Sequence, residues 1–160
     1  MFVERLFGYM PTPREKHKQK QISKVIFEEA IIEGDYRSLV QNRVAIDRFT
    51  GGAFESALFA EQPVFGGRAT IQFAVKEADE AEIGLLLLVL KDLWTGYLPV
   101  GGEASVGRGR LQGQTAVIDD TVTGKAWRLN AGADTLVVEG NAATLEAYVT
   151  RFVQAMEGER

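Results

Sequence analysis

The sequence of 160 residues contains no cysteine and a single histidine, His17. Without cysteine, the chain cannot form disulfides, zinc ribbons, iron–sulfur clusters or a cysteine nucleophile. One histidine excludes a multi-histidine metal site, and a Ser-His-Asp triad is possible only with His17 as its base. The absence of cysteine slightly favours a reducing compartment, so we expect a cytoplasmic protein.

Long apolar runs are also missing. The longest, Gly84 to Leu90, is far shorter than the roughly 18 residues that a membrane span needs. The first ten residues include Glu4 and Arg5 and lack a small-residue cleavage site, so we do not expect a secretory signal. These absences predict a protein without membrane contact.

The chain has no excess of positive charge. It holds 18 lysines and arginines against 22 acidic residues, for a net charge of −4, so a site for nucleic acid must be a local patch. Hydrophobic residues make up 46% of the sequence, which is enough for a core and excludes disorder for most of the chain. The length favours one domain, residues 1–160.

A local patch of positive charge lies between Pro11 and Lys24. This segment carries five basic residues against the one acidic residue Glu15: Arg14, Lys16, Lys18, Lys20 and Lys24. We interpret it as a mobile basic loop, and the alternative is a solvated linker. His17 lies among the lysines, a setting that suits acid–base cleavage of RNA without a metal, although a lone exposed histidine is by default a surface residue.

Alternation of polar and apolar residues predicts the strands. We expect strands near residues 22–30 and 42–48, with a turn at Gly34-Asp35 between them, and a further strand over residues 69–75. Later short strands contain Thr115 to Val117, Trp127 to Leu129 and Leu136 to Val138. Breaks between these are expected at Asp119-Asp120, Gly124 and Gly132.

Two helices are predicted. Asp79 followed by Glu82 is typical of a helix start, and the leucine-rich run to about Gly96 is apolar almost all round, so this helix should be the most buried element. A closing helix should start at Asn141 and bury Leu145, Tyr148 or Val149, Phe152 and Met156. The order of elements predicts an α+β fold, with helices on one face of an antiparallel sheet.

The first candidate binding segment is the strand and loop over residues 42–53. It delivers Arg48, Phe49 and the Gly51-Gly52 pair to a loop. Arginine forks onto phosphate and an aromatic ring stacks on an unpaired base, which is the usual chemistry for single-stranded nucleic acid. The alternative is an exposed hairpin in which Asp47 and Arg48 pair locally.

The second candidate is the stretch from Gly101 to Arg110, which continues to Gly113. It interleaves Arg108 and Arg110 with glycines, so backbone amides and guanidinium groups can both approach phosphates. The stretch lacks the Lys-Ser/Thr ending of a P-loop and precedes a strand, which argues against a mononucleotide site. The alternative is a glycine-rich strand edge or bulge. The acidic pairs, such as Asp119-Asp120, form no evident metal site.

These segments resemble the RAMP superfamily of CRISPR-associated proteins, especially the backbone subunits of type III effector complexes. Leu6-Phe7-Gly8, residues 44–53 and residues 101–113 are similar to three motifs of that family, and Leu58 to Val64 resembles a strand entry between them. The resemblance covers about residues 5–113. Within the single domain it leaves three parts: residues 1–24 with the basic loop, 25–113, and the C-terminal strands and helix in 114–160.

The resemblance implies a modified ferredoxin-like, RNA-recognition-type fold that binds CRISPR guide RNA and other effector subunits or copies of itself. Since the sequence offers no metal or cofactor motif, we expect neither a metal nor a cofactor. The loop after Asp47-Arg48 would correspond to a protruding thumb, and the Gly101 to Arg110 loop would line the RNA backbone. The candidate RNA-binding residues are Arg14, Lys16, Lys18, Lys20, Arg43, Arg48, Phe49, Thr50, Gly51, Gly101, Gly102, Ser105, Gly107, Arg108, Gly109 and Arg110.

The resemblance also implies an incomplete N-terminus. In the family, the Phe-Gly motif follows a first strand and helix, whereas here it begins at residue 6. The segment that bears the target-cleaving aspartate of catalytic members would then be absent, so we expect RNA binding without catalysis. Two alternatives remain: a metal-independent endoribonuclease that processes CRISPR RNA through His17, and a structural subunit with mainly protein contacts.

Overall fold

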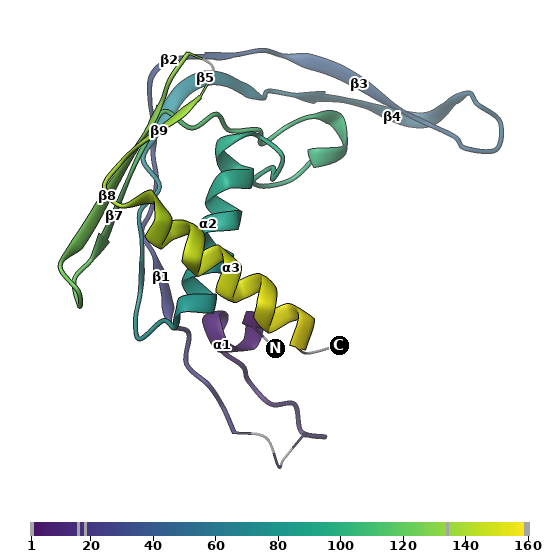
Figure 1. Cartoon of the computed structure of the whole chain (residues 1–160). Coiled ribbons are helices and arrows are strands. Elements are labelled where there is room, and N and C mark those ends of the chain that lie inside the picture. The colour runs from purple at the N-terminus through teal and green to yellow at the C-terminus, as the bar shows by residue number, and fades with distance from the viewer. Residues whose placement is uncertain (1, 16, 18, 134, 159–160) are drawn as a thin grey trace. The chain divides into compact units, whose positions relative to one another are not determined.

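The computed structural model describes residues 2–15, 17, 19–133 and 135–158. It contains two compact units. We call Met1–Lys24 with Lys76–Arg160 the helical unit, and Val25–Val75 the ribbon unit. The expectation of one domain, with its three parts, stays a prediction. Figure 1 follows the elements along the chain: α1 (Phe2–Phe7), β1 (Val25–Phe27), β2 (Ile32–Ser38), β3 (Gln41–Ile46), β4 (Ala53–Glu61), β5 (Val64–Ala69), β6 (Phe73–Val75), α2 (Glu80–Trp94), the 3-10 turn η1 (Ala104–Val106), β7 (Thr115–Asp120), β8 (Lys125–Ala131), β9 (Leu136–Glu139) and α3 (Ala142–Gly158).

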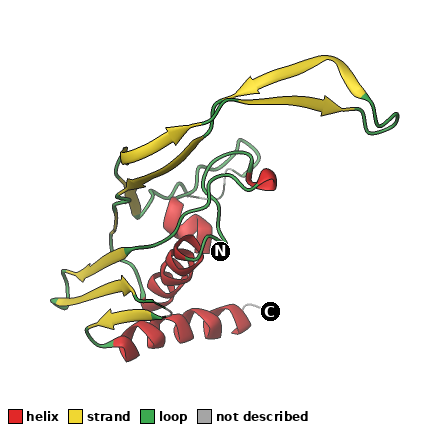
Figure 2. Ribbon diagram, turned by 90° about the horizontal axis from the view of Figure 1, so that it is seen from above, coloured by secondary structure: helices red, strands yellow, loops and turns green. Residues whose placement is uncertain are grey.

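The core lies in the helical unit, between an antiparallel sheet of order β7-β8-β9 and two helices. Alternate residues of β8, Trp127 and Leu129, are buried on one face of the sheet and pack with Leu145 and Tyr148 of α3. Helix α2 adds Ile83, Leu87 and Trp94 to the same cluster. Both helices therefore cover one face of this sheet, as Figure 2 shows.

Helix α2 starts as predicted, because the Asp79 side chain caps the Glu82 amide and the Glu82 side chain caps the Asp79 amide. Gly84 lets α2 approach α3 closely, since a Cβ there would lie 2.1 Å from the Tyr148 carbonyl oxygen. Helix α2 is, as predicted, the least exposed element of the described chain. Glu82 and Gly84 are buried, and only Glu80 and Lys91 are exposed, while the other residues of the helix are half-buried.

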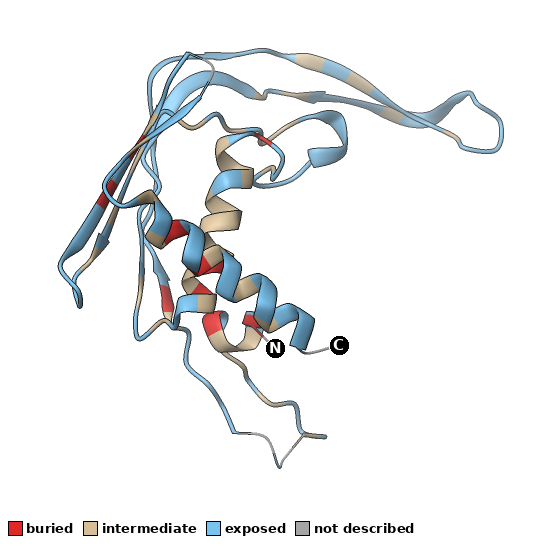
Figure 3. Cartoon of the chain, in the orientation of Figure 1, coloured by how far each residue is buried: buried red, intermediate tan, exposed pale blue. Residues whose placement is uncertain are grey.

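The ribbon unit consists of three two-stranded antiparallel pairings, β1 with β6, β2 with β5 and β3 with β4. All residues of β2 and β5 are exposed, and Figure 3 shows exposure along the β3–β4 hairpin as well. A two-stranded ribbon has no second layer to cover its faces, and such ribbons are only marginally stable alone in water.

Several strand boundaries differ from the predicted ones. Residues 69–75 do not form one strand: β5 ends at Ala69 and pairs with β2, while β6 starts at Phe73 and pairs with β1. Strand β1 covers only part of residues 22–30, and Gly34-Asp35 lies at an irregularity inside β2 instead of a turn. Alternation reveals which face a residue occupies but not where a strand changes partner, so these breaks were invisible in the sequence.

Smaller corrections concern the C-terminal part. Asp119 and Asp120 belong to β7, and the break follows them. Helix α3 starts one residue after Asn141, with Leu145 and Tyr148 buried but Met156 43% exposed. The glycine-rich stretch contains one turn of 3-10 helix, η1, where we expected no helix.

The fold class is α+β with antiparallel sheets and helices, as predicted, and it is consistent with a ferredoxin-like fold. In the described part of the chain, the strands divide among four sheets, of which β7-β8-β9 has the most strands. The incomplete N-terminus stays a prediction. Among the described residues, no helix has the length and apolar character of a membrane span.

Candidate nucleic-acid interface

The tip of the β3–β4 hairpin presents the first candidate side chains. Asp47 organises the turn: its amide donates to the Gly52 carbonyl at 2.8 Å, and its carboxylate accepts the Phe49 amide at 2.8 Å. The hydrogen bond from the Phe49 amide is the main cause that holds the pKa of Asp47 below its ordinary value. Because Asp47 bonds to the backbone of the turn, Arg48, Phe49 and Thr50 lie exposed at the tip, with Phe49 97% exposed.

Arg43 and Gly51 have structural roles in the same hairpin. The Arg43 Nε lies 3.2 Å from the Glu61 Oε2 of the opposite strand, so this half-buried guanidinium braces β3 against β4. Gly51 has φ +68° and donates its amide to the Asp47 carbonyl. Arg48 is exposed at the tip of the hairpin and has no hydrogen bond or ion pair with any described side chain.

The glycine-rich loop is anchored to the end of α2 by close backbone contacts. Val100 donates its amide to the Gly109 carbonyl at 2.9 Å, and a Cβ on Gly109 would lie 1.9 Å from the Val100 carbonyl oxygen. Gly113 lies against the Trp94 ring, where a Cβ would come within 1.9 Å, and donates its amide to the Trp94 carbonyl. These glycines are required by packing, although they lie in a loop before β7 and not at a strand edge or bulge.

The outer part of the loop is open. Gly101, Gly102 and Gly107 have nothing within 4 Å of where a Cβ would be, and Ser105 is exposed in η1. Arg110 is exposed as well. Arg108 differs, because its Nη1 forms an ion pair with the Glu103 Oε2. In this loop, Arg110 is thus exposed to solvent, whereas Arg108 is paired with Glu103.

The basic loop is closed at its base and exposed toward its tip. Tyr9 and Gln21 exchange two backbone hydrogen bonds of 2.9 Å, which close the segment between them. Arg14, His17 and Lys20 belong to that segment, and all three are exposed. The candidates Lys16 and Lys18 lie outside the described residues.

The Leu6-Phe7-Gly8 motif fixes the start of this loop. Leu6 is fully buried, and its carbonyl accepts the Ser23 hydroxyl and the Lys24 amide. Gly8 has φ +82°, and a Cβ there would lie 2.6 Å from the Gln21 carbonyl oxygen. The motif therefore allows the chain to leave α1 and run beside residues 21–24.

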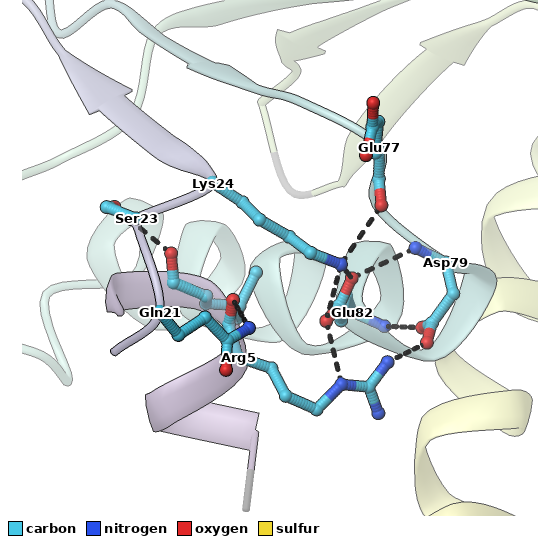
Figure 4. Close-up of polar contacts among 8 residues, drawn as sticks. Arg5, Gln21, Ser23, Lys24, Glu77, Asp79 and Glu82 are labelled. Carbon is cyan, nitrogen blue, oxygen red and sulfur yellow. Dashed lines mark hydrogen bonds and ion pairs between the residues drawn. The ribbon is translucent and has the colours of Figure 1, made fainter. Parts of the chain in front are cut away.

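A buried carboxylate ties both ends of the basic loop to α2 (Figure 4). Glu82 has no exposed surface, and its carboxylate lies 2.8 Å from the Lys24 Nζ and 3.1 Å from the Arg5 Nε. Lys24 also donates to the Glu77 carbonyl at 3.0 Å, and Arg5 forms an ion pair with Asp79. Since Arg5 precedes the loop and Lys24 follows it, one acidic side chain holds both of its ends.

The pKa of Asp79 reflects the same cluster. Burial acts to raise it, but the Glu82 amide and the Arg5 guanidinium outweigh burial and hold the pKa below its ordinary value. Asp79 is therefore ionised at neutral pH, both as the cap of α2 and as a partner of Arg5.

Within each unit, the structure joins some of the predicted residues. The tip of the hairpin gathers Arg48, Phe49, Thr50 and Gly51 in the ribbon unit, while the helical unit holds the basic loop and the glycine-rich loop. Sequence reasoning missed Glu103 and the second role of Glu82. The capping pattern identified Glu82 as a helix start, but nothing local indicates its pairing with Arg5 and Lys24, which are distant in sequence.

No three acidic or histidine side chains of the described segments lie close enough together to hold a metal ion. The interface candidates instead offer guanidinium groups, backbone amides and one fully exposed aromatic ring. This is the chemistry that suits phosphates and unpaired bases.

Comparison with known families agrees with this chemistry. A family model of the RAMP superfamily matches residues 1–112, which include the hairpin and nearly all of the glycine-rich loop. The chain belongs to the RAMP superfamily. Membership supports a CRISPR-associated, RNA-binding role. No curated protein matches the chain.

Proposed function

We propose that this RAMP protein is an RNA-binding subunit of a type III-like CRISPR effector ribonucleoprotein and holds guide RNA without cutting it. The observation that carries the proposal is the hairpin tip, where Arg48 and the 97% exposed ring of Phe49 stand on a turn ordered by Asp47. A fully exposed phenylalanine ring does not stabilise the fold through burial, whereas it can stack on an unpaired base.

The glycine-rich loop supports the same proposal from the helical unit. Its anchored glycines fix the loop at Val100 and Trp94, and its open part leaves backbone amides and Arg110 accessible to a phosphate chain. Arg14 and Lys20 of the basic loop add positive charge to a protein whose net charge is −4. The partners we propose are guide RNA and other effector subunits or further copies of this chain, in the cytoplasm.

Binding of single-stranded RNA by the full chain tests the proposal. Fluorescence anisotropy with labelled single-stranded RNA should show binding at low salt that weakens as salt rises, with a slope of about −0.7 per phosphate contact. Duplex DNA of the same sequence should bind more weakly, because its bases are not available for stacking. No binding of RNA at low salt, with the chain folded, would contradict the proposal.

A further inference from the structure

One of the two arginines of the glycine-rich loop forms an ion pair with an acidic side chain. The Glu103 carboxylate pairs with the Arg108 guanidinium, and the Arg108 amide also lies 3.4 Å from the Glu103 carbonyl oxygen. The pair is not sealed from solvent, since the side chains are 38% and 24% exposed. Arg110, two residues further on, is exposed.

The backbone at Glu103 is unusual. Glu103 has φ +59° and ψ +31°, the left-handed conformation that residues other than glycine, asparagine and aspartate seldom adopt. Glycines stand at many positions of this loop, yet a glutamate occupies a left-handed one. A non-glycine residue is strained in this conformation, so the fold alone does not explain why this position carries a carboxylate.

The chemistry of the pair matches the chemistry of the proposed ligand. A guanidinium binds a carboxylate and a phosphodiester with the same set of N–H donors. Glu103 engages the Nη1 end of the Arg108 guanidinium, so a phosphate that binds the same donors has to displace the carboxylate. No atom lies within 4 Å of a Cβ built at the flanking Gly101, Gly102 or Gly107, so the loop is not packed there, and a rotation of the Glu103 side chain is enough to release the Arg108 guanidinium.

We infer that the Glu103 carboxylate competes with RNA phosphate for Arg108 and so lowers the RNA affinity of the glycine-rich loop. This inference rests on the proposed function. Arg108 exchanges an internal partner for phosphate on binding, whereas Arg110 binds without such an exchange. The competition lowers the affinity for a polyanion that contacts the protein only at Arg108. An RNA that is also held at other points of the protein can still bind the loop.

If Glu103 has a structural role, its removal should change the RNA affinity in the opposite direction. If Glu103 instead holds Arg108 in the orientation that phosphate requires, loss of the carboxylate weakens RNA binding. A general effect of negative charge near the RNA predicts a third pattern, in which removing Glu103 strengthens binding whether or not Arg108 is present.

The test is a double-mutant cycle in the full chain with Glu103→Gln, Arg108→Ala and the combined variant, using labelled single-stranded RNA. Glutamine keeps the size of the side chain and removes its charge. Since exposed ion pairs contribute about 0.2 to 1 kcal/mol, Glu103→Gln should raise the affinity roughly 1.5-fold to 5-fold. Because salt also screens the Glu103–Arg108 pair, this gain in affinity should shrink as the salt concentration rises.

In the Arg108→Ala background, Glu103→Gln should have no effect on RNA affinity. Unchanged or weaker binding by the single Glu103→Gln variant, or equal strengthening in both backgrounds, would overturn the inference while the proposed function stands. Absence of RNA binding by the wild type and all three variants would overturn the proposed function and the inference together. Thermal melting of each variant checks that the loop change leaves the fold intact.

Discussion

At the scale of single residues, exposure separates side chains that serve the fold from those that are available to a ligand. Phe49 and Val122 are both apolar and almost fully exposed, at 97% and 93%, in the turns of two different hairpins. Neither contributes appreciable burial to the fold. They differ in surroundings, because Phe49 stands beside Arg48, whereas Val122 follows Asp119 and Asp120.

Phe49→Ala should lower the affinity for single-stranded RNA by about 1 to 3 kcal/mol, the usual contribution of one base stacked on an aromatic ring. Its melting temperature should equal that of the wild type, since the ring is exposed. Anisotropy titrations and thermal melts measure both. Val122→Ala is the matched control and should change neither; if the two variants lose RNA affinity equally, Phe49 is not a stacking residue.

Glu82 is the opposite case, a charged residue without exposed surface. Glu82→Gln leaves Arg5 and Lys24 without the carboxylate that pairs with both. Breaking a buried pair in this way costs about 3 kcal/mol, which urea denaturation should detect. The control is Glu80→Gln in the same turn of α2: its carboxylate is 62% exposed and 3.4 Å from Arg151, so less than about 1 kcal/mol should be lost. Similar losses from both variants would show that the Glu82 cluster adds no more stability than the exposed pair of Glu80 and Arg151.

At the scale of elements, the sequence was most informative where one residue pattern has one structural meaning. The capping pattern at Asp79 and Glu82 gave the start of α2, and Trp127 and Leu129 gave the inner face of β8. Patterns with two meanings were less informative. The alternation over residues 69–75 fits one long strand or the ends of two, and pairing with β2 and β1 decides for two.

The candidate loops show the same limit. The sequence pattern of Gly101 to Gly113 fits either a stretch that approaches phosphates or a packed glycine bulge, but the glycines of this stretch divide into two kinds. Gly109 and Gly113 are enclosed by Val100 and Trp94, while Gly101 and Gly102 are open. The sequence does not distinguish them, because the contacts come from the segment 94–100 folding back on the loop.

Two glycine substitutions test that division. Gly109→Ala places a Cβ 1.9 Å from the Val100 carbonyl oxygen at φ +73°, and strain of this kind costs about 1 to 3 kcal/mol. The melting temperature should fall, and RNA affinity should fall with it as the loop loses its anchor. Gly102→Ala meets open space and should leave the melting temperature unchanged. Equal stability of the two variants would contradict the anchored loop.

At the scale of the whole molecule, the elements that we propose to bind RNA are exposed and the core is small. Buried apolar residues concentrate in the cluster of β8 and α3, while the ribbon unit exposes both the hairpin tip and large apolar side chains such as Leu58 and Phe54. Family membership and the exposure of these elements both support a role in RNA binding. The binding hypothesis and the enzyme hypothesis differ in the role that they assign to His17.

We expect no hydrolysis of RNA by the purified chain, with or without magnesium. General acid–base cleavage needs a group positioned against the scissile atoms, and His17 is an exposed side chain in the basic loop. Gel analysis of labelled RNA after incubation with the chain measures cleavage. If RNA is cut, and His17→Ala abolishes the cutting while RNA still binds, the processing endoribonuclease is the correct function.

The central claim is that the hairpin tip and the glycine-rich loop both contact RNA, and photo-crosslinking tests it most directly. The full chain is irradiated in complex with single-stranded RNA that carries 4-thiouridine, and the crosslinked peptides are mapped by mass spectrometry. We predict crosslinks at the tip around Phe49 and within Gly101 to Gly113. Bound RNA whose crosslinks all lie outside these two segments would contradict the claim.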